Sequence, residues 1–307
     1  MIIKILYFCV KLANYFRMKK ILFLLLATIC FCACKEKEEK LAIAGSGWND
    51  IAIINKKTGI IEWKHTLEPG DECNDIEVTP EGNILFAYAR GAKLMSRNHE
   101  TLWEYKAGEN EEIHTASRLP DGGIMVGVCG EPARIIEFDR NGKQTNEITF
   151  RTYIFDISYQ FRQVTKTDDG IYLVPLIARQ TVLRYTMDGQ SIGLVYAGYD
   201  VFSAKQLENK NLLISCGRNS LFLEINPEKQ QKENIIVTRE IQGGVLRYVA
   251  EIYLYKNGNK LIANSNMFSV DKSQPLLIEI DSNNRVVWKL PYNKEINNIT
   301  AVYSFFE

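Results

Sequence analysis

The sequence predicts an all-β fold, a six-bladed β-propeller of four-stranded blades, and two observations lead to this class. A tight turn between apolar strands recurs along the chain, with its turn residues at positions 82, 122, 170, 210 and 258. Each interval of 40 or 48 residues between these turns holds four short apolar segments, and no stretch after residue 40 has helical periodicity. Four strands in such an interval are typical of one propeller blade.

A candidate signal peptide occupies residues 1–33, which contain five basic residues and no acidic one. Met18-Lys19-Lys20 precedes an apolar run from Ile21 to Ala33 that is too short to span a bilayer. We therefore expect translation to begin at Met18.

The end of the apolar run resembles a bacterial lipobox, because a small residue, Ala33, precedes Cys34. The resemblance implies that Cys34 is lipidated and becomes the mature N-terminus, and that residues 34–40 form a charged tether. Charged residues directly after such a cysteine resemble the surface-export signal of Bacteroidetes lipoproteins. This implies a lipid anchor in the outer membrane and a chain that faces the periplasm or the outside. An ordinary signal peptide that happens to contain cysteine is the alternative.

Residues 41–307 are expected to form the propeller, and these 267 residues give 44.5 for each of six units. In one unit the predicted strands are Ile84–Ala89, Ala92–Ser96, Leu102–Tyr105 and His114–Leu119, with turn-forming residues between them. Leu41–Ala44 begins where a unit begins after its first turn, and Thr300–Phe306 ends where a unit reaches that turn. We therefore expect the C-terminal strand to join the N-terminal blade as its innermost strand and to close the ring.

The segment Ala52–Gly59, followed by Trp63, resembles the repeat of quinoprotein propellers, and Trp103 and Trp288 occupy the same place in their units. The resemblance implies that each tryptophan packs flat between neighbouring blades. Quinoprotein dehydrogenases that bind PQQ have eight blades, a vicinal disulfide and an acidic calcium site. None of these is visible in this sequence, so PQQ and other cofactors are not expected.

The segment Ile113–Gly122 resembles an inner strand of bacterial arylsulfotransferase propellers, in which a histidine at the channel mouth precedes a turn of the form Leu-Pro-x-Gly. This resemblance implies six blades and a catalytic His114 that accepts a sulfuryl group, supported by Arg162. The alternative, which we favour, is that His114 is a hydrogen-bonded residue of the inner strand.

Residues just before the inner strands and just after the second strands should share one rim of the channel. This rim contains five arginines, although residues 34–307 carry 32 basic and 37 acidic residues. A guanidinium binds carboxylate, sulfate or phosphate through two parallel hydrogen bonds. Ordinary rim salt bridges to Glu72, Asp75, Glu131 and Asp200 are the alternative. The predicted ligand-binding residues are Asn74, His114, Arg162, Arg90, Arg179, Arg218 and Arg247.

The cysteines of the propeller, Cys73, Cys129 and Cys216, fall on the same rim. Three thiols could bind a soft metal ion, but we favour small apolar fillers and predict no metal site. The whole chain has 37 basic and 37 acidic residues and no basic stripe with interleaved aromatic residues, so a nucleic-acid partner is not expected.

These observations favour a non-enzymatic binding module for an anionic small molecule, a glycan or a partner segment at the channel mouth. One alternative is an arylsulfotransferase-like enzyme that uses His114. The other is a scaffold subunit that docks envelope proteins on its flat faces.

Overall fold

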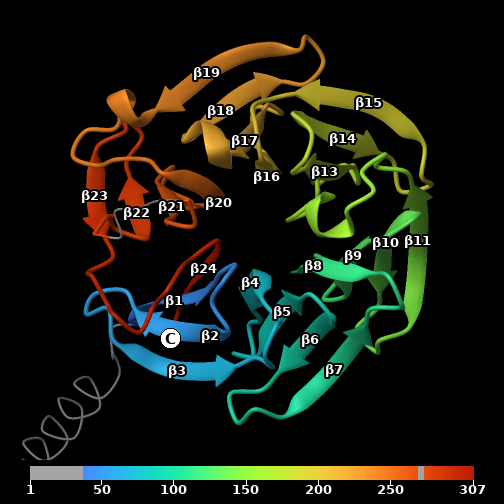
Figure 1. Ribbon diagram of the computed structural model, residues 1–307, viewed down its shortest axis with the longest axis horizontal. Helices are drawn as coiled ribbons and strands as arrows, with labels where there is room; N and C mark the ends of the chain where they lie inside the picture. The colour runs from blue at the N-terminus through green and yellow to red at the C-terminus, as the bar shows by residue number, and fades with distance from the viewer. Residues whose placement is uncertain (1–36, 269–272) are drawn as a thin grey trace, which may run out of the picture. The chain divides into compact units, whose positions relative to one another are not determined.

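The computed structural model describes residues 37–268 and 273–307, and its strands form six four-stranded antiparallel sheets. The sheets stand around a common axis as the blades of a six-bladed propeller (Figure 1). The predicted fold class is therefore confirmed. Residues Glu39–Phe305 form one compact unit. The predicted signal peptide and Cys34 lie outside the described residues.

The blades follow one another along the chain, each built from its innermost to its outermost strand. Blade 1 contains β24 (Ala301–Phe306), β1 (Glu39–Ala44), β2 (Asp50–Asn55) and β3 (Ile61–Thr66). Blade 2 contains β4 (Cys73–Val78), β5 (Ile84–Tyr88), β6 (Gly91–Met95) and β7 (Thr101–Lys106). Blade 3 contains β8 (Glu112–Arg118), β9 (Ile124–Cys129), β10 (Ala133–Phe138) and β11 (Gln144–Phe150).

The second half of the ring has the same plan. Blade 4 contains β12 (Thr165–Lys166), β13 (Tyr172–Leu176), β14 (Thr181–Tyr185) and β15 (Ser191–Tyr196). Blade 5 contains β16 (Val201–Gln206), β17 (Leu212–Cys216), β18 (Leu221–Asn226) and β19 (Gln231–Val237). Blade 6 contains β20 (Tyr248–Leu254), β21 (Lys260–Ser265), β22 (Leu277–Ile280) and β23 (Val286–Lys289).

Three short 3₁₀ helices lie in connections of the described chain: η1 (Ile157–Tyr159), η2 (Gly217–Asn219) and η3 (Thr238–Glu240). None of the helices in the described residues is long and apolar enough to cross a membrane. The two 48-residue intervals of the repeat arise from long connections between blades, at 151–164 with η1 and at 238–247 with η3. Long connections commonly carry function, so these two are the first places to look for a site.

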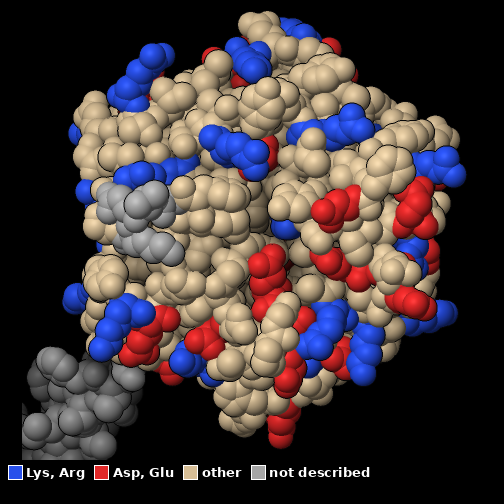
Figure 2. Space-filling view, viewed as in Figure 1, with Lys and Arg blue, Asp and Glu red and all other residues tan. Residues whose placement is uncertain are grey.

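Charge is distributed unevenly on the face of the ring shown in Figure 2. Acidic side chains gather over blades 2 and 3, whereas Lys and Arg predominate over blades 4 and 5. The surface is hollowed near the centre of the ring, where the inner strands meet.

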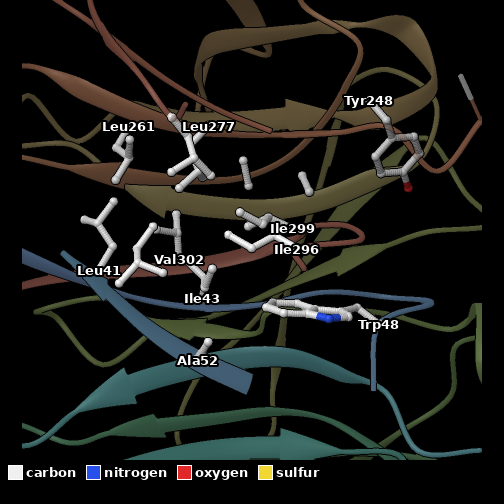
Figure 3. Close-up of a cluster of buried hydrophobic side chains, with 14 of the residues drawn as sticks. Leu41, Ile43, Trp48, Ala52, Tyr248, Leu261, Leu277, Ile296, Ile299 and Val302 are labelled. Carbon is white, nitrogen blue, oxygen red and sulfur yellow. The ribbon is translucent and has the colours of Figure 1, made fainter. Parts of the chain in front are cut away.

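Ring closure occurs between blades 6 and 1, where strands from the two ends of the chain pack together. Leu41 and Val302 share one buried cluster with Leu261 and Leu277 (Figure 3). Burial of apolar surface contributes roughly 25 cal/mol per Å², so this interface stabilises the closed ring. The expected innermost place of the C-terminal strand is confirmed.

Side chains of the inner strands also join neighbouring blades. Oδ2 of Asp75 accepts a hydrogen bond from the amide of Ala116 at 3.1 Å. Oε2 of Glu251 accepts one from the amide of Val302 at 2.9 Å, which ties blade 6 to blade 1. Burial and the negative charge of Glu251 raise the pKa of Asp75 well above its usual range. We interpret these carboxylates as links between blades.

The three tryptophans of the repeat contact the following blade, as the resemblance to quinoprotein repeats implies, but Trp103 does not pack flat. Nε1 of Trp63 donates to the carbonyl of Arg97 in blade 2 at 2.9 Å. Trp103 packs edge-on against Phe138 of blade 3, with ring centroids 5.2 Å apart. The Nζ of Lys56, in blade 1, lies 5.6 Å from the ring centroid of Trp288.

A polar and cationic candidate site at the channel mouth

The candidate site lies at the channel mouth, which we define as the end of the ring where the innermost strands begin. Four inner strands contain a β-bulge near this end. The ladder of β4 skips Asn74 and that of β8 skips His114, and both side chains are buried. A bulge redirects the side chain of the extra residue, so Asn74 and His114 are available to bond across the mouth.

A chain of hydrogen bonds connects these two residues to their neighbours. Nε2 of His114 lies 2.9 Å from Oε2 of Glu112, and its Nδ1 lies 3.3 Å from the amide nitrogen of Asn74. Oδ1 of Asn74 accepts a bond from the hydroxyl of Ser46 at 2.5 Å. Oε1 of Glu112 accepts one from the hydroxyl of Ser158 at 3.1 Å. The chain therefore runs from blade 1 through blades 2 and 3 to the connection before blade 4.

These partners fix the protonation of His114. Because the amide nitrogen of Asn74 only donates, Nδ1 accepts, and Nε2 carries the proton that is donated to Glu112. Burial and the positive charge of Arg162 lower the pKa of His114 to about 4, and the bond to His114 lowers the pKa of Glu112. The imidazole is neutral at pH 7 and both of its nitrogens are engaged.

Arg162 differs from Arg90 and Arg218, which form ion pairs with Asp71 and Asp200. Its guanidinium donates to the carbonyl of Phe161 at 3.1 Å, and no carboxylate of the described residues lies within ion-pairing distance of it. The hydroxyl of Thr115 bonds the carbonyl of Arg162 at 3.1 Å and so fixes its backbone. A partly buried guanidinium without a counter-ion keeps its donors for an anion.

Arg218 and Arg247 lie together in a pocket of about 240 Å³ that Tyr248 and Phe268 also line. Nε of Arg218 lies 3.1 Å from Oδ2 of Asp200, and its guanidinium stacks 5.6 Å from the ring of Phe268. Burial raises the pKa of Asp200, although the charge of Arg218 opposes this. Burial and the negative charge of Asp200 raise the pKa of Tyr248, whereas the positive charge of Arg162 lowers it.

The other two predicted arginines bind elsewhere on the same face. Arg90 forms a two-pronged ion pair with the buried Asp71, with distances of 3.0 Å and 2.7 Å. Arg179 is exposed and donates to the carbonyl of Tyr153 at 2.9 Å. The structure thus brings Asn74, His114 and Arg162 into one group and places Arg218 and Arg247 in the pocket with Tyr248. Arg90 and Arg179 bind elsewhere.

Sequence reasoning missed several residues of the mouth, above all its exposed aromatic side chains. Phe155 is fully exposed, and Tyr153 and Phe268 expose 71% and 65% of their surface. All three lie in connections at this end of the ring. For the first two, the signal was the 48-residue interval between the turns at 122 and 170, which is eight residues longer than its neighbours and contains both aromatic residues. Glu112 could have been found from the sequence, because it lies only two positions before His114.

The three cysteines are buried thiols in three separate hydrophobic clusters, so the structure does not bring them together. Burial raises the pKa of Cys129 and of Cys216 to about 12. Among the described residues, no group of three or more histidine, cysteine or acidic side chains could hold a metal ion.

The sequence profile of the family described as Mal s 1 allergenic protein-like matches residues 47–285, more than half of the chain. The chain belongs to this family. The matched segment of this Mal s 1-like chain includes blades 2 to 5 whole and with them Asn74, His114 and Arg162. A comparison with curated proteins found no match.

Solved structures similar to this Mal s 1-like chain include a protein of unknown function from Bacteroides caccae. It is 36% identical, with a TM-score of 0.82, and the match covers 87% of this chain and 98% of that one. A catalytically inactive virginiamycin B lyase from Staphylococcus aureus, solved with quinupristin, gives a TM-score of 0.57 at 14% identity and covers 90% and 94% of the two chains. A streptogramin B lyase gives 0.55 at 13% identity over 85% and 88%. The two lyases share the fold alone.

Proposed function

We propose that the chain is a binding module that takes an anionic small molecule or glycan at the channel mouth, with Arg162 as the anchor of the acid group. The observation that carries this proposal is the guanidinium of Arg162, which is partly buried and has no ion pair within the described residues. Arg90 and Arg218, by contrast, already hold Asp71 and Asp200.

The chemistry around Arg162 supports a ligand with an acid group attached to a ring. A sulfate, carboxylate or phosphate accepts two parallel bonds from a guanidinium. Tyr248 and Phe268 line the neighbouring pocket and offer flat apolar surfaces to a sugar or aromatic ring. The volume of about 240 Å³ fits one ring, and the exposed aromatic residues of the rim can contact a larger ligand.

The test measures the thermal stability of the protein with a panel of sulfated, carboxylated and phosphorylated sugars and aryl compounds. A ligand at 100 times its Kd stabilises by about 2.7 kcal/mol, which raises the Tm of a domain of this size by roughly 5–10 °C. Arg162→Gln should remove this shift, because Arg90 and Arg218 already hold carboxylates.

Arg179→Gln is the matched control, since it removes one positive charge from the same face at an exposed site. Equal loss in both variants would show that only the general positive potential attracts the anion, and would contradict the anchor role of Arg162. A flat response of the wild-type protein to the whole panel would refute the proposal and leave docking of an envelope protein as the better hypothesis.

Sulfuryl transfer through His114 has less support than binding. A sulfuryl acceptor needs a free nitrogen lone pair, and the lone pair of Nδ1 is directed at the amide of Asn74. The transfer of a sulfuryl group from an aryl sulfate to a phenol, lost in His114→Ala, would reverse this preference.

We also propose that Cys34 anchors the chain to the outer membrane through its lipid. The support is the sequence Met18–Lys40, which has a basic start, a short apolar run, Cys34 and a charged tether. A labelled fatty acid fed to cells should enter the wild-type protein and not Cys34→Ser. Unlabelled wild-type protein would show an ordinary signal peptide.

A further inference from the structure

Two of the three histidines of the chain face each other where blades 1 and 2 meet, apart from the network of the mouth. His65 lies in the outermost strand β3, and His99 lies in the hairpin between β6 and β7. Their Nδ1 atoms are 3.2 Å apart, and the ring centroids are 5.3 Å apart. Trp63 stacks on His99 from the same blade as His65.

The fold does not require histidine at position 99. His99 has a φ of 65°, in the left-handed region that favours glycine. Glycine holds the same place in the hairpins of blades 1, 3 and 4, whereas Gln and Asn hold it in blades 5 and 6. These residues are Gly59, Gly142, Gly189, Gln230 and Asn284.

Position 65 shows the same contrast with its equivalents in other blades. His65 lies two residues beyond the register shift between β2 and β3. The corresponding positions in the outermost strands of blades 2 to 5 are apolar or aromatic. They are Tyr105, Ile148, Val195 and Ile236. Both histidines therefore depart from the pattern of the repeat, and the two departures lie in contact with each other.

The distance between the two nitrogens suits a shared metal ion. Two imidazole nitrogens at 2.0–2.1 Å from one ion are about 2.9 Å apart at a right angle and about 3.4 Å apart at the tetrahedral angle. The observed 3.2 Å lies between these values. No described residue bonds Nε2 of either ring, so each Nε2 can carry its proton in water while both Nδ1 lone pairs converge.

The charges around the pair balance. The carboxylate of Asp50 favours a cation near His65, whereas the ammonium of Lys93 opposes one. Lys93 is itself within 3.4 Å of Glu104, which offsets its charge. Burial and the neighbouring His99 lower the pKa of His65.

We propose that His65 and His99 form a two-imidazole site for a divalent transition-metal ion of the copper, nickel and zinc class, with water as the remaining ligands. Imidazole suits these ions, and Cu(II) binds most tightly in the series. The bound ion links blade 1 to blade 2, so it should raise the Tm of the propeller. This site is independent of the anion site at the mouth.

The experiment titrates the full chain with Cu(II) and records binding by calorimetry and the ion's environment by electron paramagnetic resonance. We expect one ion with nitrogen coupling from two imidazoles. His65→Tyr and His99→Gly introduce residues that other blades carry at the same places, so both variants should fold. Each should weaken the binding of this ion by about tenfold or more and lose the two-nitrogen signal.

Each single variant keeps His114 and every cysteine of the leader and the propeller, so binding to those groups remains as an internal control. Unchanged affinity and an unchanged spectrum in both variants would overturn the proposal and show that the two rings only share a hydrogen bond. If one variant loses binding and its circular dichroism spectrum shows that it is unfolded, the result of the other variant decides.

Discussion

His114 shows at the scale of one residue how hydrogen-bond partners decide a role. An inner-strand histidine at a channel mouth could act as a nucleophile, but Asn74 and Glu112 bond both ring nitrogens. Asn74 in turn holds Ser46 through its carbonyl oxygen. Such a network is worth most when every member is satisfied, because an unpaired buried polar group costs free energy. His114 therefore links blades 2 and 3.

The first prediction is that His114→Ala destabilises the protein by about 2–4 kcal/mol at pH 7. The variant leaves a buried amide donor of Asn74 without its partner and opens a small cavity. Urea unfolding measures the change. His65→Ala, at a partly exposed position, is the control and should cost less than 1 kcal/mol. Equal small effects would contradict the structural role of His114.

His114 also makes the free energy of unfolding depend on pH, in a direction that its pKa determines. The pKa of His114 falls from 6.5 to about 4 on folding, so the unfolded chain binds a proton that the folded chain refuses. Above pH 6.5 the ionisation of His114 has no effect on the free energy of unfolding. As the pH falls from 6.5 to 4, it lowers that free energy progressively, by about 1.4 kcal/mol per pKa unit. His114→Gln should reduce that slope in unfolding experiments, and an unchanged slope would show that folding does not shift the pKa of His114.

At the scale of elements, the long connection 151–164 contributes many of the residues at the channel mouth. It holds Arg162, Ser158 and three exposed aromatic residues, yet its regular structure is confined to the short helix η1. Gln160 anchors it, because its side-chain amide exchanges hydrogen bonds of 2.8 Å and 3.0 Å with the backbone of Gly130 and also bonds the carbonyl of Ile154.

We accordingly predict that Gln160→Ala frees this connection without unfolding the ring. Amide hydrogen exchange at 151–160 should accelerate, and the Tm should fall by a few degrees, because three hydrogen bonds of a buried side chain are lost. Gln190→Ala, in an exposed hairpin turn, is the matched control and should change neither. Exchange that stays slow at 151–160 would show that Gln160 does not hold the connection.

The parts of the structure that the sequence predicts are those set by local patterns. Turn residues such as Gly82 and Gly122, followed by alternating strands, fix the number of blades and the closing strand. The mouth depends on partners from different blades, so it could not be deduced. Arg90 and Arg162 look equivalent in the sequence, and only the position of Asp71 separates them. The bulges that redirect the side chains of Asn74 and His114 leave no signal in a two-residue period.

At the scale of the whole molecule, the ring is closed by strand β24, which comes from the opposite end of the chain. Ala301 and Val302 are fully buried, and the amide of Val302 bonds Glu251 of blade 6. The hydroxyl of Tyr253 donates to the carbonyl of Ser304 at 3.1 Å. Without β24, strand β1 would present an unpaired edge, and the carboxylate of Glu251 would keep Gln163 and Lys205 but lose the amide of Val302.

The last prediction follows from that closure. A chain that ends at residue 299 should lose cooperative unfolding and tend to aggregate, and a synthetic peptide of residues 300–307 should restore the sharp transition by adding the missing strand. A peptide with Val302→Lys should fail, because it places a charge in the buried cluster with Leu41 and Leu261. Denaturant unfolding, followed with and without each peptide, measures both effects. If the shortened chain unfolds as sharply and at the same denaturant concentration as the full chain, five complete blades and three strands suffice, and closure by β24 contributes little to stability.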